Sequence, residues 1–267
     1  MISSGDRQIG VRRDVRPGGT VAFVTIDNPR RLNSMNGALM AEFVEAFAQL
    51  ALDESLRAVV LTGAGEAAFV GGADIREMAV LSGSDEARAF ITQVHRCCAA
   101  VRDLPVPVIA RINGAAYGAG LELAAACDLR VAATTAMFGM QEVRLGIPSV
   151  VEAALLPALV GWGRTREILL LGETFSARDA AAWGLVERLA EPDALDAAVE
   201  TWLAALLSSS PGAVRAQKAL IRKWEDLPLS AAISAGVDSF AASFATPEPS
   251  EAMAAFLERQ RARKEKS

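Results

Sequence analysis

The sequence predicts an α/β fold in which strands and helices alternate, followed by a region that is helical only. Three observations lead to this prediction. Short β-branched runs alternate with amphipathic helical patterns over the first two thirds of the chain. Aromatic residues make up only 6% of the 267 residues, so the core must consist mainly of Ala, Val, Leu and Ile. From Glu191 onward the pattern becomes purely helical.

The first part of the chain has the strand, helix, strand order of βαβ units. Predicted strands cover residues 20–26, 57–62, 106–112 and 128–132, and predicted helices cover residues 37–52, 85–102 and 121–126. Pro105 and Pro107 exclude a helix at the third of these strands, because proline lacks the N–H that a helix interior needs. The recurrence of strand, strand, helix units suggests a coiled stack of similar layers.

The last part of the chain is predicted to form a separate helical region. Four helices are expected, over residues 192–207, 211–224, 229–244 and 249–260, with prolines at or near their starts. Their alanine-rich apolar faces exceed what a bundle at the edge of a domain needs to bury. We therefore expect residues 1–190 to form the site-bearing core and residues 191–267 to pack against other subunits.

Composition argues against membrane and nucleic-acid partners. No uninterrupted apolar run approaches the roughly 18 to 20 residues that cross a bilayer, and residues 1–10 lack the apolar stretch of a secretory signal. A soluble cytoplasmic protein is expected. The net charge is −5, and the basic residues are scattered apart from the tail 259–266. No electrostatic footprint for nucleic acid is present in such a sequence.

Cysteine and histidine usage argues against metal sites and a histidine-based triad. The cysteines, Cys97, Cys98 and Cys127, lack metal-ligand spacing and are predicted to be buried reduced thiols. The single histidine, His95, falls within a helical pattern, which makes histidine metal sites and a Ser-His-Asp triad unexpected. Chemistry must therefore come from carboxylates and backbone groups.

Two glycine-rich segments, residues 63–75 and 113–122, each follow a predicted buried strand and lead into a helix. Glycines let the backbone approach a ligand closely, and helix N-termini present unpaired N–H groups. Two such termini facing each other would form an oxyanion hole. The third glycine of a dinucleotide fingerprint is missing, and no Gly-Lys-Ser/Thr sequence ends a phosphate loop. Tight turns without a ligand remain the alternative for either segment alone.

These segments carry a family resemblance. Residues 62–78 and 107–124 are similar to the two signature stretches of the enoyl-CoA hydratase/isomerase (crotonase) superfamily. Further similarity lies at residues 28–35, 127–128, 138–139, 176–186 and 252–258, so that the resemblance covers nearly the whole chain. It implies a crotonase-like spiral of repeated ββα units with a C-terminal helical oligomerisation region, assembled as a homotrimer or as a hexamer.

The resemblance also implies a site. The backbone N–H groups of Ala73 and Ala119 would hold the thioester carbonyl of an acyl-CoA substrate. Glu122 would orient and deprotonate water, and Glu142 would exchange a proton at the α-carbon. Taken singly, Glu122 is also explained as an acid favoured in the first turn of a helix, and Glu142 as a partner in a surface salt bridge.

Contacts with coenzyme A carry over to five positions: Arg30, Ser34, Gly71, Asp74 and Ile75. Coenzyme A is then part of the substrate, and no separate cofactor or metal is expected. Arg30 would meet phosphate charge, although an ordinary solvated arginine is an equal alternative. Tyr117 is a candidate for the wall of the acyl pocket.

Residues 145–153 depart from the family pattern. Typical hydratases carry a Leu-Gly, Pro-Gly and Gly-Gly-Thr run here, whereas this chain is one residue shorter and lacks the later glycines. Glu152 becomes a third candidate carboxylate near the acyl pocket. The alternative, which we favour, is an N-terminal acid preceding a helix over residues 153–160.

The function that these features imply is hydration of a 2-enoyl-CoA to a 3-hydroxyacyl-CoA by a lyase, by syn addition of water, in degradation of fatty acids or related acyl-CoA compounds. Two other outcomes stay open. The altered segment 145–153 favours a Δ3,Δ2-enoyl-CoA isomerase or a dehydratase of a specialised acyl-CoA. A non-catalytic RNA- or protein-binding member of the superfamily is disfavoured by the acidic balance and by the presence of both glutamates.

Overall fold

The computed structural model describes residues 8–264. Ten strands form two sheets within this range. The larger sheet has the order β1 (Ile9–Arg16), β2 (Gly19–Ile26), β3 (Leu56–Gly63), β5 (Val108–Ile112), β7 (Leu129–Ala133) and β10 (Arg188–Ala190). The smaller sheet has the order β4 (Ala68–Val70), β6 (Ala115–Tyr117), β8 (Met137–Gly139) and β9 (Thr174–Ser176). The successive strands of each sheet belong to successive turns of a spiral.

The larger sheet is parallel except at its first edge. β1 and β2 form an antiparallel hairpin, and β2, β3, β5, β7 and β10 then pair in parallel. Seven of the eight residues of β3 are buried. A near-continuous apolar run of this kind is typical of a strand that is covered on both faces, and it explains why the sequence signal of β3 was strong.

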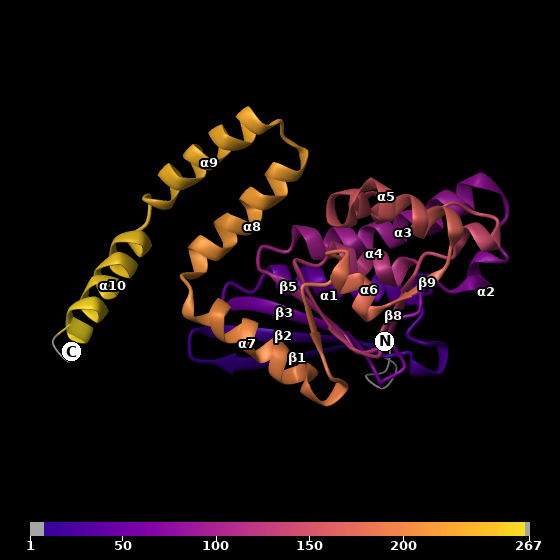
Figure 1. Ribbon diagram of the computed structural model, residues 1–267, viewed down its shortest axis with the longest axis horizontal. Helices are drawn as coiled ribbons and strands as arrows, with labels where there is room; N and C mark the ends of the chain where they lie inside the picture. The colour runs from indigo at the N-terminus through magenta and orange to yellow at the C-terminus, as the bar shows by residue number, and fades with distance from the viewer. Residues whose placement is uncertain (1–7, 265–267) are drawn as a thin grey trace. The chain divides into compact units, whose positions relative to one another are not determined.

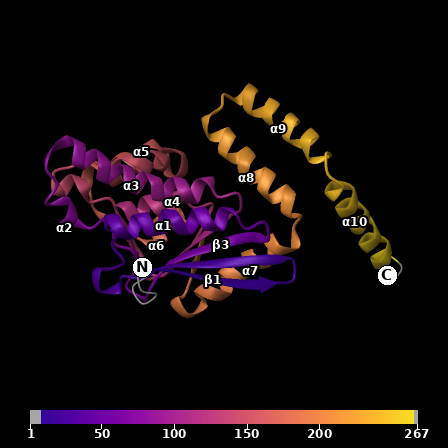
Figure 2. The same cartoon turned by 180° about the vertical axis from the view of Figure 1, so that it is seen from behind.

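Helices α1 (Gly37–Ala51), α3 (Gly83–Asp103) and α4 (Ala119–Ala126) lie together on one face of the larger sheet (Figures 1 and 2). α1 begins after Asn36, whose side chain accepts a hydrogen bond from the Leu39 N–H. The apolar faces of α1 and α3 pack on each other, and α4 packs on α3. The short α4 is buried along seven of its eight residues, so it can hold a polar group out of water.

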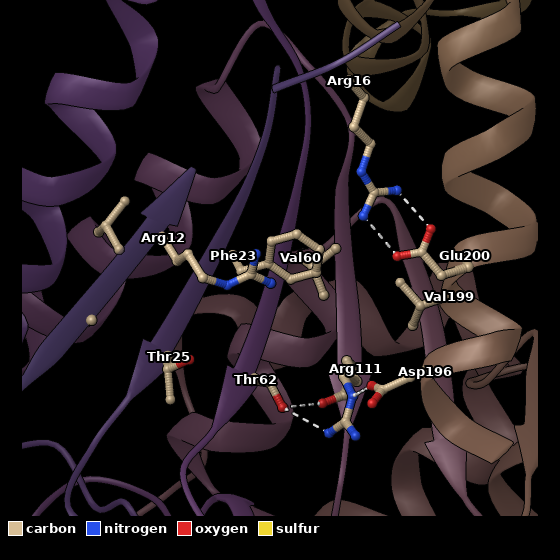
Figure 3. Close-up of a pocket in the computed structure, with 12 residues that line it drawn as sticks. Arg12, Arg16, Phe23, Thr25, Val60, Thr62, Arg111, Asp196, Val199 and Glu200 are labelled. Carbon is tan, nitrogen blue, oxygen red and sulfur yellow. Dashed lines mark hydrogen bonds and ion pairs between the residues drawn. The ribbon is translucent and has the colours of Figure 1, made fainter. Parts of the chain in front are cut away.

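The opposite face of the larger sheet meets the first part of α7 (Leu195–Ser208) around a hollow of about 660 Å³ (Figure 3). Arg16 forms two hydrogen bonds to Glu200, of 2.6 and 2.9 Å, and Arg111 Nε lies 2.5 Å from Asp196. The guanidinium of Arg12 lies over the ring of Phe23, 4.1 Å from its centroid. These contacts engage the arginines of the hollow and anchor α7 to the sheet.

The remaining elements are shorter or lie toward the C-terminus. They are α2 (Ile75–Met78), α5 (Leu156–Leu171), α6 (Ala177–Ala182), α8 (Pro211–Asp226), α9 (Leu229–Ser243) and α10 (Glu248–Lys264), with 3-10 helices η1 (Pro29–Arg31), η2 (Glu142–Leu145), η3 (Val151–Leu155) and η4 (Pro192–Ala194). No helix within residues 8–264 has both the length and the apolar character of a membrane span.

The predicted long elements are all present, and most lie within two residues of their expected bounds. Three helices differ more: the one predicted at 192–207 begins at Leu195 after η4, the one predicted at 249–260 extends to Lys264, and the one predicted at 153–160 covers Leu156–Leu171. The short strands β4, β6, β8, β9 and β10 were not predicted. Each has three residues, too few to show a period, and each is defined by pairing with a distant segment.

The chain divides into two compact units between Leu203 and Ala204. In the second unit α8 packs against α9, and Trp224 Nε1 donates a 2.9 Å hydrogen bond to the carbonyl of Ala232. The carboxylate of Glu248, at the start of α10, accepts hydrogen bonds from the Gly212 N–H at the start of α8. The division near residue 190 into a site-bearing core and an oligomerisation region concerns function and stays a prediction.

Candidate active site

A cavity of about 580 Å³ opens beside the buried helix α4. Its wall is formed by the loop between β4 and α2, the start of α4, one face of α3 and the segment from Gln141 to Val150. Both predicted glutamates, Glu122 and Glu142, line this cavity, and so does Tyr117. The chain therefore brings together side chains that lie some 20 residues apart along the sequence.

The smaller sheet places two backbone N–H groups at this cavity. β4 and β6 pair in parallel, with Ala68 opposite Ala115 and Val70 opposite Ala116, so the loops that follow them leave the same edge of the sheet. Ala73 lies in the first loop, and Ala119 is the first residue of α4; both line the cavity. Among the hydrogen bonds of the described residues, none is donated by either N–H. Two such donors can bind one oxyanion.

Glycine is required at two positions beside these donors. Gly118 has a φ of +50°, and a Cβ there would lie 2.5 Å from Glu142 Oε1. A Cβ on Gly120 would lie 2.0 Å from the carbonyl oxygen of Val70, because α4 packs directly on β4. The two glycines therefore set how close α4 and Glu142 can come to the donor loops.

The variant Gly118→Ala tests this spacing. We expect it to displace the Glu142 carboxyl and to lower kcat/KM for an enoyl-CoA by roughly 100-fold, since misplacement of about 1 Å has effects of that order. Thermal unfolding should show a native fold of reduced Tm, because a non-glycine residue at positive φ is strained. Retention of wild-type kcat/KM would show that activity does not depend on the close approach of Glu142 to residue 118.

Glu122 lies in the first turn of α4 with 4% of its surface exposed. Its Oε1 accepts a 3.2 Å hydrogen bond from the Ala153 N–H. Burial, followed by the charge of Glu142, raises the pKa of Glu122 from 4.5 to about 8; the Ala153 hydrogen bond opposes this rise, and the charge of Glu152 adds the smallest contribution to it. A carboxyl with such a pKa can both hold and release a proton near neutral pH.

Glu142 lies at the start of η2, and its carboxylate faces the same cavity. Its Oε2 accepts a 2.7 Å hydrogen bond from the Ser149 hydroxyl. Within the part of the chain that the structure describes, no basic side chain forms an ion pair with Glu142. The alternative of a surface salt bridge is therefore wrong.

Comparison with known proteins assigns the fold to a family. The model of the enoyl-CoA hydratase/isomerase family matches residues 16–266. The chain belongs to this family. It is 34% identical to the short-chain-enoyl-CoA hydratase of Clostridium acetobutylicum over 244 residues, 91% of this chain and 93% of that one. It is 35% identical to the crotonyl-CoA hydratase of Syntrophomonas wolfei over 243 residues, with the same coverage.

Solved structures of the family share the whole fold. A crystal structure of enoyl-CoA hydratase from Bacillus anthracis superposes with a TM-score of 0.89 at 32% identity, over 95% of this chain and 97% of that one. The enoyl-CoA hydratase of Mycobacterium smegmatis gives a TM-score of 0.88 at 33% identity. The expected α/β crotonase fold is thereby confirmed, including the presence of C-terminal helices.

The coenzyme A contacts expected for a member of this family divide into two groups. Gly71 and Ile75 line the cavity. Arg30, Ser34 and Asp74 lie outside its wall, with Arg30 exposed in η1. Their contacts with coenzyme A stay predictions.

Asp74 has a structural function that the sequence did not reveal. Its Oδ1 accepts a 2.9 Å hydrogen bond from the Arg76 N–H at the start of α2, and its Oδ2 lies 2.8 Å from Arg31 Nη1. Burial raises the pKa of Asp74, but hydrogen bonds from Arg76 and Arg31 outweigh burial and lower the pKa below its usual value. Asp74 thus holds the loop that carries Ala73.

The apolar wall of the cavity was not predicted as part of the site. It comes largely from α3, whose residues Phe90, Ile91 and Val94 face the cavity, and from Leu145 and Ile147. The helical spacing of the α3 residues was visible in the sequence, but it did not indicate that this face covers a cavity rather than the core. Residues 8–264 contain no cluster of three or more His, Cys, Asp or Glu side chains that could hold a metal ion.

Glu152 lies at a helix start, as the favoured interpretation of the sequence expected. It is the acid in the first turn of η3, which leads into α5 at Leu156, and only 7% of its surface is exposed. It also lies outside the wall of the cavity. Its Oε1 is 2.8 Å from His95 Nδ1, so the pair joins η3 to α3.

Proposed function

We propose that this protein is an enoyl-CoA hydratase, which adds water to a 2-enoyl-CoA to give a 3-hydroxyacyl-CoA. The observation that carries the proposal is the convergence of Glu122 and Glu142 on one cavity with the unpaired N–H groups of Ala73 and Ala119. The names of the relatives from Clostridium acetobutylicum and Syntrophomonas wolfei support the same activity. The acyl-CoA thioester is then the substrate, and coenzyme A enters as part of it.

In the proposed reaction the thioester carbonyl oxygen accepts hydrogen bonds from the N–H groups of Ala73 and Ala119. Glu122 takes a proton from water as the water oxygen bonds to the β-carbon. The electron pair of the double bond moves toward the carbonyl, and the two N–H donors stabilise the enolate charge. Glu142 then delivers a proton to the α-carbon, so that one water molecule is added in total. Both carboxyls face the substrate from one cavity, which supports syn addition.

The electrostatics of the pair suit this reaction. Because Glu142 is one of the groups that raise the pKa of Glu122, the two carboxyls favour a state that shares a single proton. Hydration needs one carboxylate as base and one carboxylic acid as proton donor. The raised pKa of Glu122 favours the single proton on Glu122, so the proposed reaction starts from the form in which that proton has passed to Glu142.

The direct test is the loss of the absorbance of crotonyl-CoA on addition of purified protein. Longer 2-enoyl-CoA substrates then define chain-length preference. Absence of turnover across all chain lengths would overturn the proposal.

A second candidate is isomerisation of a 3-enoyl-CoA or dehydration of a specialised acyl-CoA. The observation that favours it is the segment 145–153, which lacks the later glycines and contributes Leu145, Ile147 and Val150 to the apolar wall. Supplying a 3-enoyl-CoA and following formation of the conjugated 2-enoyl-CoA separates this activity from hydration. The non-catalytic alternative, binding of RNA or protein, would require a complex without turnover, and the net charge of −5 disfavours RNA.

The assembly is proposed to be a homotrimer or a hexamer in the cytoplasm. Its support is the apolar surface of the second unit. Exposed large apolar side chains there include Leu229, Ile233, Val237, Phe240, Phe244, Met253, Phe256 and Leu257. Apolar surface of this density needs a partner. A monomeric mass in sedimentation at micromolar concentration would contradict the assembly without affecting the proposed activity.

A further inference from the structure

The hydrogen bond that holds Glu122 comes from a strained turn. The Ala153 N–H is shared between the carbonyl of Val150, at 2.9 Å, and Glu122 Oε1, at 3.2 Å. Two residues earlier, Val151 has a φ of +41°. A β-branched residue rarely adopts this left-handed conformation, and strain of this kind persists only where surrounding contacts enforce it.

The residue next to Val151, Glu152, forms a pair with His95. Glu152 is buried in η3, and its Oε1 lies 2.8 Å from His95 Nδ1, which belongs to α3. The side chain of His95 is 54% exposed, so the pair leads from the buried turn to solvent. The second oxygen, Oε2, is buried and has no hydrogen-bond partner among the described residues. An unpaired carboxyl oxygen is costly to bury, so its retention calls for an explanation.

The other groups around Glu152 do not neutralise it. From α3 come the thiols of Cys97 and Cys98; burial, with Glu152 as a further cause, raises the pKa of Cys97 to about 12 and that of Cys98 well above its usual value. From α4 comes Glu122, with Glu142 of η2 beyond it.

Helix α5 also packs on η3. Its arginines interact with groups other than Glu152. Arg164 pairs with Glu167 and lies over Trp183, and Arg166 lies over Trp162. Within residues 8–264, His95 is therefore the cationic or donor partner that the structure gives to Glu152.

We propose that the pair of His95 and Glu152 is a positioning element for Glu122. It fixes the η3 turn whose Ala153 N–H holds the Glu122 carboxyl, and it places a second carboxylate behind that group. The N–H of His95 Nδ1 donates to Glu152 Oε1, and the negative charge of Glu152 then disfavours ionisation of Glu122. The pair acts through Glu122 and does not touch the substrate, since neither residue lines the cavity.

The pH dependence gives the sign of the effect. A like charge near Glu122 raises its proton affinity, so the charge of Glu152 moves the ionisation of Glu122 to higher pH. Removal of that charge should move the ionisation to lower pH. In the proposed hydratase, the acid limb of the kcat/KM profile reports ionisation of the Glu122 and Glu142 pair in the free enzyme.

The variant Glu152→Gln is the central test, because glutamine keeps the size of the side chain and an acceptor for His95 while it removes the charge. We expect the acid limb of kcat/KM for crotonyl-CoA to move to lower pH by roughly half a unit to one unit, as loss of a nearby like charge predicts. The KM at the pH optimum should change less than kcat/KM does on the acid limb. An acid limb that stays in place, or that moves to higher pH, overturns the proposal.

Two histidine variants separate position from charge. The variant His95→Gln retains an N–H donor for Glu152, whereas His95→Ala removes it. We expect His95→Ala to lower kcat more than His95→Gln does, and the double variant of His95→Ala with Glu152→Gln to move the acid limb no further than Glu152→Gln alone. Additive shifts of the acid limb would show that the two residues do not act as one element. The matched control is Glu167→Gln, which removes an exposed carboxylate of α5 and should leave the profile in place.

A measurement without turnover separates this inference from the proposed function on which its kinetic reading rests. The infrared band of a protonated carboxyl, taken as the difference between wild type and Glu122→Gln, follows the titration of Glu122 itself. The same difference in the Glu152→Gln background should titrate at lower pH, because the like charge is gone. In the His95→Ala background, which keeps the Glu152 carboxyl and loosens the turn that supplies the Ala153 N–H, it should titrate at higher pH. A shift in the titration of the infrared band without any enoyl-CoA turnover would support the positioning role of His95 and Glu152 and reject the hydratase activity. Turnover with an unshifted band would support the hydratase activity and reject the positioning role. If Glu152→Gln does not fold, His95→Ala carries the infrared test.

Discussion

Replacing Glu122 or Glu142 by glutamine should lower kcat/KM for crotonyl-CoA by roughly 10² to 10⁴, the usual contribution of a positioned acid or base. Glutamine keeps the shape of either side chain but can neither take a proton from water nor give one to the α-carbon. Glu122→Gln also keeps an acceptor for the Ala153 N–H, so its effect isolates proton transfer from position. The measurement is initial rate by loss of enoyl thioester absorbance.

The double variant distinguishes two ways in which the carboxyls can act. If both carboxyls are needed in one transition state, removing the second lowers kcat/KM little once the first is gone. The kcat/KM of the double variant should then be within about tenfold of that of the less active single variant. Fully multiplicative losses would mean that the two residues act in separate steps. A Glu142→Gln variant with wild-type kcat/KM would favour a member of the family that uses a single carboxyl, as expected for some isomerisation chemistry.

Glu122→Gln should also stabilise the fold, and increasingly so as pH rises. The pKa of Glu122 is raised from 4.5 to about 8, so between these values the folded protein binds a proton that the unfolded chain has released. The stability that this proton contributes is fully present below about pH 4.5 and is lost as pH rises through about 8. The variant lacks that dependence.

The difference in unfolding free energy between variant and wild type should therefore grow from pH 5 to pH 8 by a few kcal/mol, to order of magnitude. Urea unfolding at the two pH values measures it, with Glu167→Gln as an exposed control. A difference that is flat with pH would mean that Glu122 is not buried as a proton-binding group.

The residues that line the cavity were easier to predict than the elements that build it. The glycine-rich segments were visible as a local pattern, whereas Glu122, Glu142 and the donors at Ala73 and Ala119 were expected from the family resemblance; all four residues line the cavity. The three-residue strands β4 and β6, which bring the donors together, were not visible. Their pairing joins Ala68 to Ala115 and Val70 to Ala116, residues 47 and 46 positions apart, and a segment of three residues carries no period.

Charge patterns revealed little of the contacts inside the protein, because one carboxylate can serve in several places. The contact of Asp74 with coenzyme A stays a prediction from the resemblance, and its hydrogen bonds with Arg31 and with the start of α2 were not visible in the sequence. Glu152 is an acid at a helix start, as expected, but its contact with His95 was not visible in the sequence. The positive φ of the neighbouring Val151 was not visible either, since propensity disfavours this conformation for a β-branched residue.

The environment of Glu122 explains why a carboxyl is kept where burial is expensive. The helix that carries it is buried along nearly its whole length, and Gly120 brings that helix onto Val70. Ala119, one of the two backbone donors, is the first residue of the same helix. The burial of Glu122 and the position of that donor therefore both depend on the packing of α4 on β4.

Ala119→Pro should lower kcat by roughly 10² to 10³, the loss that follows removal of one oxyanion donor. Ala119 is the first residue of α4, a position where proline is tolerated because its N–H is not needed by the helix. The first hydrogen bonds of α4 run from the Leu121 and Glu122 N–H groups to the Gly118 carbonyl, so they do not use the Ala119 N–H. The substitution thus deletes the donor while it keeps the helix that carries Glu122.

The matched control for this variant is Ala119→Gly, which removes the methyl group and keeps the N–H. If the donor is what matters, the loss of kcat in Ala119→Pro should exceed that in Ala119→Gly by at least about tenfold. Circular dichroism and Tm establish that both variants are folded. Equal losses in the two variants would assign the effect to packing of α4 on β4, and an active Ala119→Pro would leave the thioester oxygen to be held by Ala73 and a group other than Ala119.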